Sequence, residues 1–270
     1  FAHVNKAAIG GHMRPDGDCV GSCMGLYLYM KENYPRIEVD VYLEEIPDSF
    51  RFIQDSGVIH HSAEEDLTYD LFLALDCGDR GRLGFSEELF RKAAKTACID
   101  HHISNVGFAD ENYIEPQASS TAELIYNLCD RDKLTKEIAE CLYLGIVHDT
   151  GVFQYSATAP STMEMAAHLM RTGIDASGII ENTYYEKTYD QNKVLGYTLL
   201  NSCRYLENRC IVSTLTAKEL SDFGVTPKEL DGIASQMRNT KGVEVSLFLY
   251  ELADGDFKGS LRSGNVVDVS

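Results

Sequence analysis

The sequence predicts an α/β fold: an N-terminal, mostly parallel sheet flanked by helices, followed by a smaller α/β domain. Along most of the chain, short apolar segments alternate with helical patterns, an order typical of parallel strands joined by crossover helices. The run over residues 71–75 is apolar throughout, as in a strand that is buried on both faces. From Ser202 onward the strands follow one another more closely, which indicates a second domain.

The first predicted strand, over residues 7–9, ends in two glycines and leads into a loop. Pro15 disfavours the helical conformation at Arg14, so we expect the loop to continue to Asp18. Apolar residues at helical spacing then predict a helix as far as Asn33. Further strands are predicted at 38–42, 71–75 and 96–99, with a helix over 86–94.

Helices dominate the rest of the first domain. The segment from Ser120 to Glu123 forms a capping box, so capping is the role predicted for Ser120 and its neighbour Ser119. A nearly apolar helix over 136–148 ends at Asp149. The remaining helices are predicted over 120–130, 161–171, 175–185 and 189–200.

The second domain is predicted to combine strands with one helix. A hairpin around Asn208 joins strands at 204–206 and 210–213, and two more strands lie near 243–252 and 258–262. A helix over 230–238 separates the two pairs. The predicted organisation is a first domain over 1–187, a connecting helix over 188–200 and a second domain over 201–270.

Composition excludes some classes of partner. The chain has 24 basic and 42 acidic residues, a net charge of −18, which argues against long duplex nucleic acid because such binding needs many Lys and Arg contacts to phosphates. No apolar stretch is long enough to span a membrane, and no signal peptide opens the chain. The eight cysteines contain no CxxC pair and several lie in apolar settings, which predicts reduced thiols and a cytoplasmic protein.

Acidic and imidazole side chains follow three predicted strands at the point where each strand ends. Because the carboxyl ends of parallel strands share one edge of the sheet, these side chains are expected to converge there. So many carboxylates at one edge would repel one another without cations. The residues are His12, Asp16, Asp18, Asp76, Asp100, His101 and His102.

Oxygen-rich donors with imidazoles and without cysteine suit Mn²⁺ or Mg²⁺ better than structural zinc. Carboxylates sufficient for two cations suggest in-line attack by a metal-held hydroxide on phosphorus. A lone Asp after a strand is more often a turn residue than a ligand, so it is the convergence of three groups that carries the interpretation.

Four ordered segments resemble the motifs of the DHH phosphoesterase family. They are His12-Met13-Arg14-Pro15-Asp16-Gly17-Asp18, then Asp76, then Asp100-His101-His102, then Asp149-Thr150-Gly151. Near the C-terminus, Lys258-Gly259-Ser260-Leu261-Arg262-Ser263 and Val267-Asp268-Val269-Ser270 resemble the DHHA1 domain. The chain is most similar to the nano-RNase (oligoribonuclease)/pAp phosphatase branch, also labelled exopolyphosphatase-related, where pAp is adenosine 3′,5′-bisphosphate.

The resemblance implies two Mn²⁺ ions, for which Mg²⁺ or Co²⁺ could substitute. It implies that one ion is held by His12 and Asp16. It implies that the second ion is held by Asp18, His101 and Asp149, and that Asp76 bridges the two. Asp149 comes from the resemblance alone, since the pattern marks it only as a helix end.

The resemblance also assigns roles around the ions. Asp100 would orient His101, and His102 would face the scissile phosphate. In the second domain, Arg262 and Ser263 would grip the substrate. Arg238 could assist in the second domain. Independently of the resemblance, Arg80 and Arg82 could reach the site because they follow Asp76 closely and Arg pairs readily with phosphate. Four further histidines are predicted to be surface or core residues: His3, His60, His61 and His168.

The function implied is a Mn²⁺-dependent phosphoesterase that hydrolyses short oligoribonucleotides, pAp or both. The alternatives are a cyclic di-AMP or pApA phosphodiesterase, and a catalytically idle nucleotide-binding module. The expected partners are short RNA or a nucleotide phosphate, and no membrane is expected to bind. The sequence leaves open whether the chain forms a homodimer. In the family a glycine-rich segment completes DHHA1, and the resemblance implies that this end is missing after Ser270.

Overall fold

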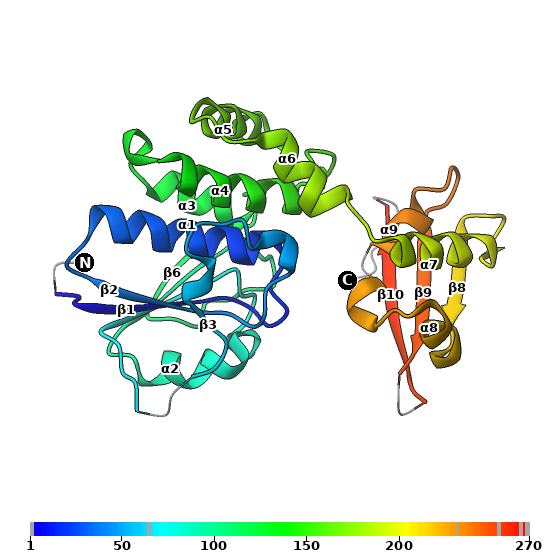
Figure 1. The fold of residues 1–270 in the computed structure, drawn as a ribbon, viewed down its shortest axis with the longest axis horizontal. Helices are drawn as coiled ribbons and strands as arrows, with labels where there is room; N and C mark the ends of the chain where they lie inside the picture. Colours follow the sequence, from blue (N-terminus) through cyan, green and yellow to red (C-terminus); the bar gives the residue numbers. More distant parts are fainter. Residues whose placement is uncertain (1–2, 64–65, 231, 253–254, 265–266, 268–270) are drawn as a thin grey trace. The chain divides into compact units, whose positions relative to one another are not determined.

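The computed structural model describes residues 3–63, 66–230, 232–252, 255–264 and 267. The chain divides into two compact units, unit 1 over Phe1–Tyr185 and unit 2 over Glu186–Ser270, which Figure 1 shows with their helices and strands. The connecting helix predicted over 188–200 is therefore part of unit 2.

Unit 1 is built on a six-stranded sheet in the order β3-β2-β1-β4-β5-β6. Every neighbouring pair of strands is parallel, which confirms the fold class. The strand order changes direction between β1 and β4, and open α/β sheets bind ligands at the carboxyl ends of the strands at such a point. The strands are β1 (Lys6–Gly10), β2 (Glu38–Tyr42), β3 (Ile59–His60), β4 (Leu71–Leu75), β5 (Thr96–Asp100) and β6 (Glu111–Ile114).

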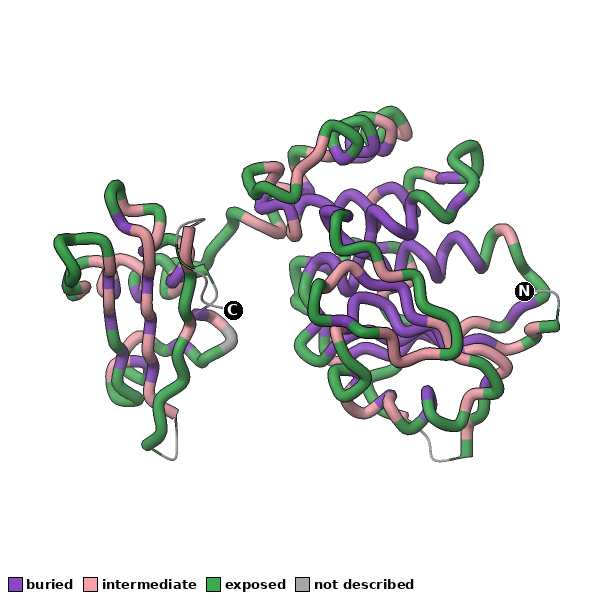
Figure 2. The backbone as a smooth tube through the Cα atoms, turned by 180° about the vertical axis from the view of Figure 1, so that it is seen from behind, coloured by how far each residue is buried: buried purple, intermediate pink, exposed green. Residues whose placement is uncertain are grey.

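Helices cover both faces of this sheet. Helices α1, α3 and α4 lie on one face and α2 lies on the other, with α5 and α6 in an outer layer (Figure 1). The largest apolar core includes residues of α1 and α4, and these two helices are buried along most of their length (Figure 2). The helices are α1 (Gly17–Asn33), α2 (Glu87–Lys92), α3 (Thr121–Leu128), α4 (Lys136–Asp149), α5 (Pro160–Arg171) and α6 (Ala176–Ile180).

Some boundaries differ from the prediction. The edge strand β6 has no apolar alternation because three of its four residues are exposed, and β3 is only two residues long; neither is predicted. The helix predicted over 86–94 is α2, which ends two residues earlier than predicted and is preceded by a 3₁₀ segment, η3 (Arg80–Ser86). The helix predicted over 175–185 is α6 followed by a π-helical turn, η5 (Glu181–Tyr185).

Unit 2 is a smaller α/β domain, as predicted. Its four-stranded sheet has the order β10-β9-β8-β7, with β8 and β9 parallel and the outer pairs antiparallel. Its core joins the sheet to the helices through Val194, Leu220, Met237 and Phe248. The elements are α7 (Tyr189–Leu200), β7 (Cys203–Tyr205), β8 (Cys210–Leu215), α8 (Ala217–Phe223), η6 (Pro227–Leu230), α9 (Ile233–Arg238), β9 (Val245–Glu251) and β10 (Phe257–Ser263).

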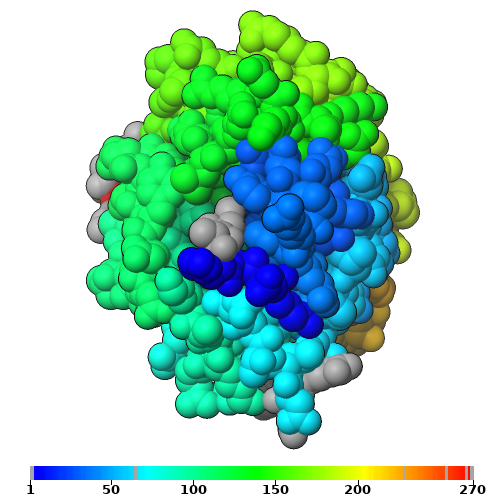
Figure 3. Space-filling view, turned by 90° about the vertical axis from the view of Figure 1, so that its left-hand side faces the viewer, coloured from blue at the N-terminus to red at the C-terminus, as the bar shows by residue number. Residues whose placement is uncertain are grey.

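The chain enters unit 1 at the edge of the sheet where the strands begin. Asn5 and Lys6 accept backbone hydrogen bonds from Glu38 and Asp70, which open β2 and precede β4, and Figure 3 shows this first segment in dark blue. Among the described residues, no helix is both long and apolar enough to cross a membrane. Of the predicted motif over 267–270, the last three residues lie outside the described residues.

Candidate metal centre

The loop after β1 places Asp16 at the start of α1. Its carboxylate accepts hydrogen bonds from the backbone N–H groups of Asp18 and Cys19, each 3.1 Å long, so it caps the helix. Its Oδ1 also lies 3.6 Å from Nε2 of His12, which is buried on the same loop. A side chain at Gly17 would meet the ring of His148 at 2.2 Å, which explains the glycine between the two acids.

Asp18 is fully buried at the N-terminus of α3. Its two oxygens accept hydrogen bonds from the backbone N–H groups of Thr121 (2.6 Å) and Ala122 (2.9 Å). The partial positive charge of this helix end stabilises a carboxylate. Oδ2 of Asp18 also lies 3.9 Å from Nε2 of His101.

Asp76, directly after β4, lies between two imidazoles. Its Oδ2 is 3.4 Å from Nε2 of His12, and its Oδ1 is 3.7 Å from Nε2 of His101. The hydroxyl of Thr121 donates a 3.1 Å hydrogen bond to Oδ1. The backbone of Asp76 has a positive φ of 56°, a costly conformation that functional sites often retain. Each oxygen of this buried carboxylate therefore faces a different histidine.

His101, directly after β5, contacts the carboxylates of Asp18, Asp76 and Asp149. Its Nε2 lies 2.9 Å from Oδ2 of Asp149 at the end of α4. Its other ring nitrogen, Nδ1, is 3.3 Å from the backbone oxygen of Ala118, an arrangement that fixes the ring and leaves Nε2 for a cation.

The contacts of Asp100 correct one expectation. Its Oδ1 forms a 2.7 Å hydrogen bond with Nδ1 of His102, not with His101. Its Oδ2 accepts a 2.7 Å bond from the side chain of Asn105, which also donates to the carbonyl of Cys77. Successive residues at a strand end point in different directions, so Asp100 reaches the histidine two positions on. The sequence predicts no role for Asn105, because no motif marks it.

Burial and mutual repulsion change the pKa values of the acids and histidines in the cluster. Burial, with Asp76 and Asp149 nearby, raises the pKa of Asp18 well above its usual range. Burial likewise raises the pKa of Asp149. Burial alone would lower the pKa of His101, but its hydrogen bond to Asp149 and the charge of Asp18 raise that pKa to about 10. A divalent cation bound by these groups would compete with their protons.

Three sets of donor atoms among the described residues are close enough to hold a cation, with the atoms of each set within 4.8 Å of one another. Asp76 and His101 each belong to two of the sets, so the sets adjoin. Cys19 is an unexpected member; its Sγ accepts a 3.2 Å hydrogen bond from the backbone of His12. The sets are His12, Cys19 and Asp76; Asp76, His101 and His102; and Asp18, His101 and Asp149.

Other predicted residues lie outside these sets. Arg80 forms a 2.9 Å ion pair with Glu87, and Arg82 is exposed with its backbone oxygen bonded to Met13. Ser120 caps α3 by accepting from the backbone of Glu123. The residues predicted for substrate binding lie in unit 2: Arg238, Arg262 and Ser263.

The four further histidines of the prediction lie outside the donor sets. His60 stacks on the ring of Tyr42, and Nδ1 of His61 lies 2.9 Å from the backbone oxygen of Leu43. His168 is hydrogen-bonded to Tyr126. His3 is exposed.

Residues 6–146, which include β1 to β6 and most of the acid cluster, match the model of the DHH family, N-terminal domain. The chain belongs to the DHH family. Enzymes of the DHH family are metal-dependent phosphoesterases, and the three donor sets agree with that property. The chain is therefore a hydrolase of this class.

Relatives with known names span both units. The chain is 28% identical over 249 residues to "Bifunctional oligoribonuclease and PAP phosphatase NrnA" of Bacillus subtilis, covering 90% of this chain and 77% of that protein. It is 29% identical to "Cyclic-di-AMP phosphodiesterase GdpP" of Geobacillus thermodenitrificans, covering all of this chain but 42% of that protein. Among solved structures, an exopolyphosphatase-related protein from Bacteroides fragilis has a TM-score of 0.89 and 26% identity, covering 98% of this chain and 81% of the other.

Proposed function

We propose that this DHH-family protein is a Mn²⁺-dependent phosphoesterase that hydrolyses short oligoribonucleotides and pAp. The observation that carries the proposal is the position of Asp76, whose two oxygens face His12 and His101. A carboxylate so placed suits a bridge between two cations. The NrnA of Bacillus subtilis, whose name gives this substrate class, supports the proposal, and the exopolyphosphatase-related structure supports the fold that it requires.

In the proposal, His12, Asp16 and Asp76 hold one cation, and Asp18, His101, Asp149 and Asp76 hold the other. Two such cations, when bound, supply Lewis acidity to the phosphoryl group and lower the pKa of an attacking water. Mn²⁺ suits a donor set of carboxylate oxygens and imidazole nitrogens. Asp18 and His101 are held in place for this role by Ala122 and Ala118.

His102 is proposed as the residue that acts on the substrate itself. Its side chain is 40% exposed, against 5% for His12 and 17% for His101, so it is the most accessible histidine of the cluster. The hydrogen bond to Asp100 raises the pKa of His102. A protonated imidazole there can stabilise negative charge on the phosphoryl oxygens or donate a proton to the leaving oxygen.

Unit 2 is proposed to bind the far end of the substrate. Within the described residues, the guanidinium of Arg262 bonds only to the carbonyl of Leu261, and that of Arg238 bonds to Asn239. Neither has a carboxylate partner there, so both remain able to bind phosphate, which Arg recognises well. Arg238 lies beside Gly264, which directly follows β10, so Arg238 is close to the end of the strand that carries Arg262 and Ser263.

The preference for short substrates follows from charge. With a net charge of −18, phosphates that extend beyond the site would meet an acidic surface instead of a basic track. Turnover should be compared with Mn²⁺ on pAp, pApA, cyclic di-AMP, a five-nucleotide RNA and a 24-nucleotide RNA. The proposal expects pAp and the shortest RNAs to have the highest kcat/KM, and a profile that rises with length would overturn it.

The same panel tests the alternatives. A cyclic di-AMP phosphodiesterase is supported by the match to GdpP, and it would show highest kcat/KM on cyclic di-AMP or pApA. An idle nucleotide-binding module would turn over none of the five. The presence of all the proposed donor residues favours an active enzyme. The cytoplasmic location stays a prediction.

A further inference from the structure

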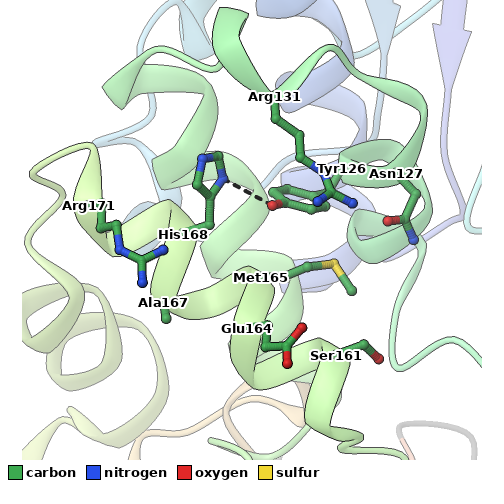
Figure 4. Close-up of a pocket in the computed structure, with 9 residues that line it drawn as sticks. All are labelled: Tyr126, Asn127, Arg131, Ser161, Glu164, Met165, Ala167, His168 and Arg171. Atoms are coloured by element: carbon green, nitrogen blue, oxygen red, sulfur yellow. Dashed lines mark hydrogen bonds between the residues drawn. The ribbon is translucent and has the colours of Figure 1, made fainter.

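A second group of polar side chains in unit 1 lies outside the acid cluster. It lines a pocket of about 420 Å³ between α3, the 3₁₀ turn η4 (Arg131–Lys133) and α5. Figure 4 shows its residues as sticks. None of the carboxylates or histidines of the candidate metal centre lines this pocket, so the proposed phosphoesterase chemistry does not account for it.

One end of the pocket is basic and held in place. The guanidinium of Arg131 lies over the Tyr126 ring, 5.2 Å from its centroid. The Tyr126 hydroxyl is 3.0 Å from Nδ1 of His168, and the two rings meet edge to face. Arg171 follows His168 by three residues on α5 and lies on the side of His168 that faces away from Tyr126 (Figure 4). The stacked Arg131 and the hydrogen-bonded His168 are thus oriented before any ligand arrives.

Both arginines line the pocket on either side of the hydrogen-bonded pair, with Arg131 over Tyr126 and Arg171 beyond His168 (Figure 4). Neither arginine has an ion pair among the described residues, although four other arginines of this acidic chain do. Those four are Arg51, Arg80, Arg91 and Arg209.

The opposite end of the pocket carries different chemistry. Glu164 and Ser161 come from the first turns of α5, and Asn127 comes from α3. In Figure 4, Met165 lies between the basic end and the side chains of Glu164 and Ser161, whereas Asn127 lies beside Tyr126. A ligand that fits would carry an anion at one end and hydroxyl or amino groups at the other.

We propose that this pocket binds a small phosphate monoester, with its phosphate at Arg131, His168 and Arg171. Two guanidiniums and an imidazole match a dianion, and Glu164 at the far end disfavours an extended polyanion such as RNA. The volume lies within the range of small-molecule sites and suits a sugar phosphate or a mononucleotide. The site is separate from the metal centre and does not depend on the proposed function.

The test is a ³¹P NMR titration of the full chain in Mg²⁺ buffer, with ribose 5-phosphate and with inorganic phosphate as probes. The expected result is saturable binding of ribose 5-phosphate that Arg131→Gln or Arg171→Gln weakens by at least about 10-fold, as for the loss of a charged hydrogen bond. Arg36→Gln is the matched control because Arg36 is exposed, and it should leave the dissociation constant unchanged. The spectrum also shows directly whether the ester remains intact.

A variant of the metal centre separates the two sites. Asp76→Asn should leave this dissociation constant unchanged, whereas a probe bound at the metal centre would respond to it. Three results would overturn the proposal: no saturable binding at millimolar probe, equal effects of Arg36→Gln and Arg171→Gln, or binding that depends on Asp76 alone. Equal affinity for inorganic phosphate and ribose 5-phosphate would overturn the proposal that the end of the pocket at Glu164 binds the sugar.

Discussion

Asp18 and Asp149 are carboxylates placed around one imidazole, His101, in a largely buried position. Such a group has two ways to neutralise its charge: it binds protons or it binds cations. The raised pKa values of His101, Asp18 and Asp149 favour proton binding in the metal-free protein. The proposed function depends on cation binding.

The metal-free protein should lose stability as pH rises from about 6.5 to about 10. The pKa of His101 is about 10 in the folded chain, against 6.5 when unfolded. Its contribution is therefore complete below pH 6.5 and lost as pH passes 10. The raised pKa values of Asp18 and Asp149 act with the same sign, because folding retains protons on them.

Thermal unfolding with a chelator, recorded from pH 6.5 to pH 10, measures this dependence. Saturating Mn²⁺ should flatten the curve, since the cation replaces the protons. A metal-free protein that becomes more stable towards pH 10 would contradict the charge assignment.

His102→Gln should lower kcat by about 10²- to 10⁴-fold, the usual contribution of a general acid. Metal content should not change, because the proposal gives His102 no cation. His61→Gln is the control, since His61 bonds the backbone of Leu43 outside the cluster. Loss of metal from the His102 variant would instead make His102 a ligand.

The residues of the cluster could be predicted largely because they come directly after strands. His12, Asp76 and His101 follow β1, β4 and β5, and a parallel sheet brings such positions together. The partners of Asp100 and the contact of Cys19 could not be predicted, because they depend on side-chain direction within a single turn.

At the scale of elements, the centre depends on how closely α1, α3 and α4 approach. A Cβ at Gly145 of α4 would lie 2.5 Å from the Cβ of Ala122 and 2.7 Å from Oδ1 of Asp18. The small residue allows α4 to reach the N-terminus of α3, where Asp18 is held. Packing in this layer therefore fixes a carboxylate of the site.

Gly145→Ala should lower the free energy of unfolding by about 1–3 kcal/mol, the usual cost of overpacking, and should weaken metal binding. Gly196→Ala in α7 is a matched control, since nothing lies within 4 Å of its added Cβ. That change should raise stability by roughly 0.5–1 kcal/mol through helix propensity. Chemical denaturation of both variants measures the difference. Unchanged stability of Gly145→Ala would contradict the close approach of α4 to the N-terminus of α3.

Elements were predictable in proportion to their burial. The fully apolar β4 and the long helices α1 and α4 have clear patterns because the core surrounds them. The edge strand β6 has no such pattern, since most of its side chains face solvent. Its pairing with β5 is a tertiary contact that its own residues do not specify.

At the scale of the whole molecule, the two units have different proposed tasks. Unit 1 contains all the proposed cation ligands, whereas unit 2 contains Arg238, Arg262 and Ser263. A change in unit 2 should therefore alter substrate affinity without altering metal content.

Arg262→Ala should weaken substrate binding by about 1.5–3 kcal/mol, the range for a hydrogen bond to a charged group. Arg209→Ala is the control, since Arg209 lies in the same unit and pairs with Glu244. Isothermal titration with a non-hydrolysable dinucleotide measures the affinity, and elemental analysis measures the metal. A variant that loses metal but keeps its affinity would contradict the division of tasks.

The most direct test of the central claim is the number of Mn²⁺ ions that bind to each chain. Asp70 and Asp76 flank the same strand, β4, and Asp70 bonds only backbone N–H groups in the described structure. We predict two Mn²⁺ ions per chain for the wild type and for Asp70→Asn, and at most one tightly bound ion for Asp76→Asn. Two tightly bound ions in Asp76→Asn, or a single ion in the wild type, would contradict the bridged two-metal centre.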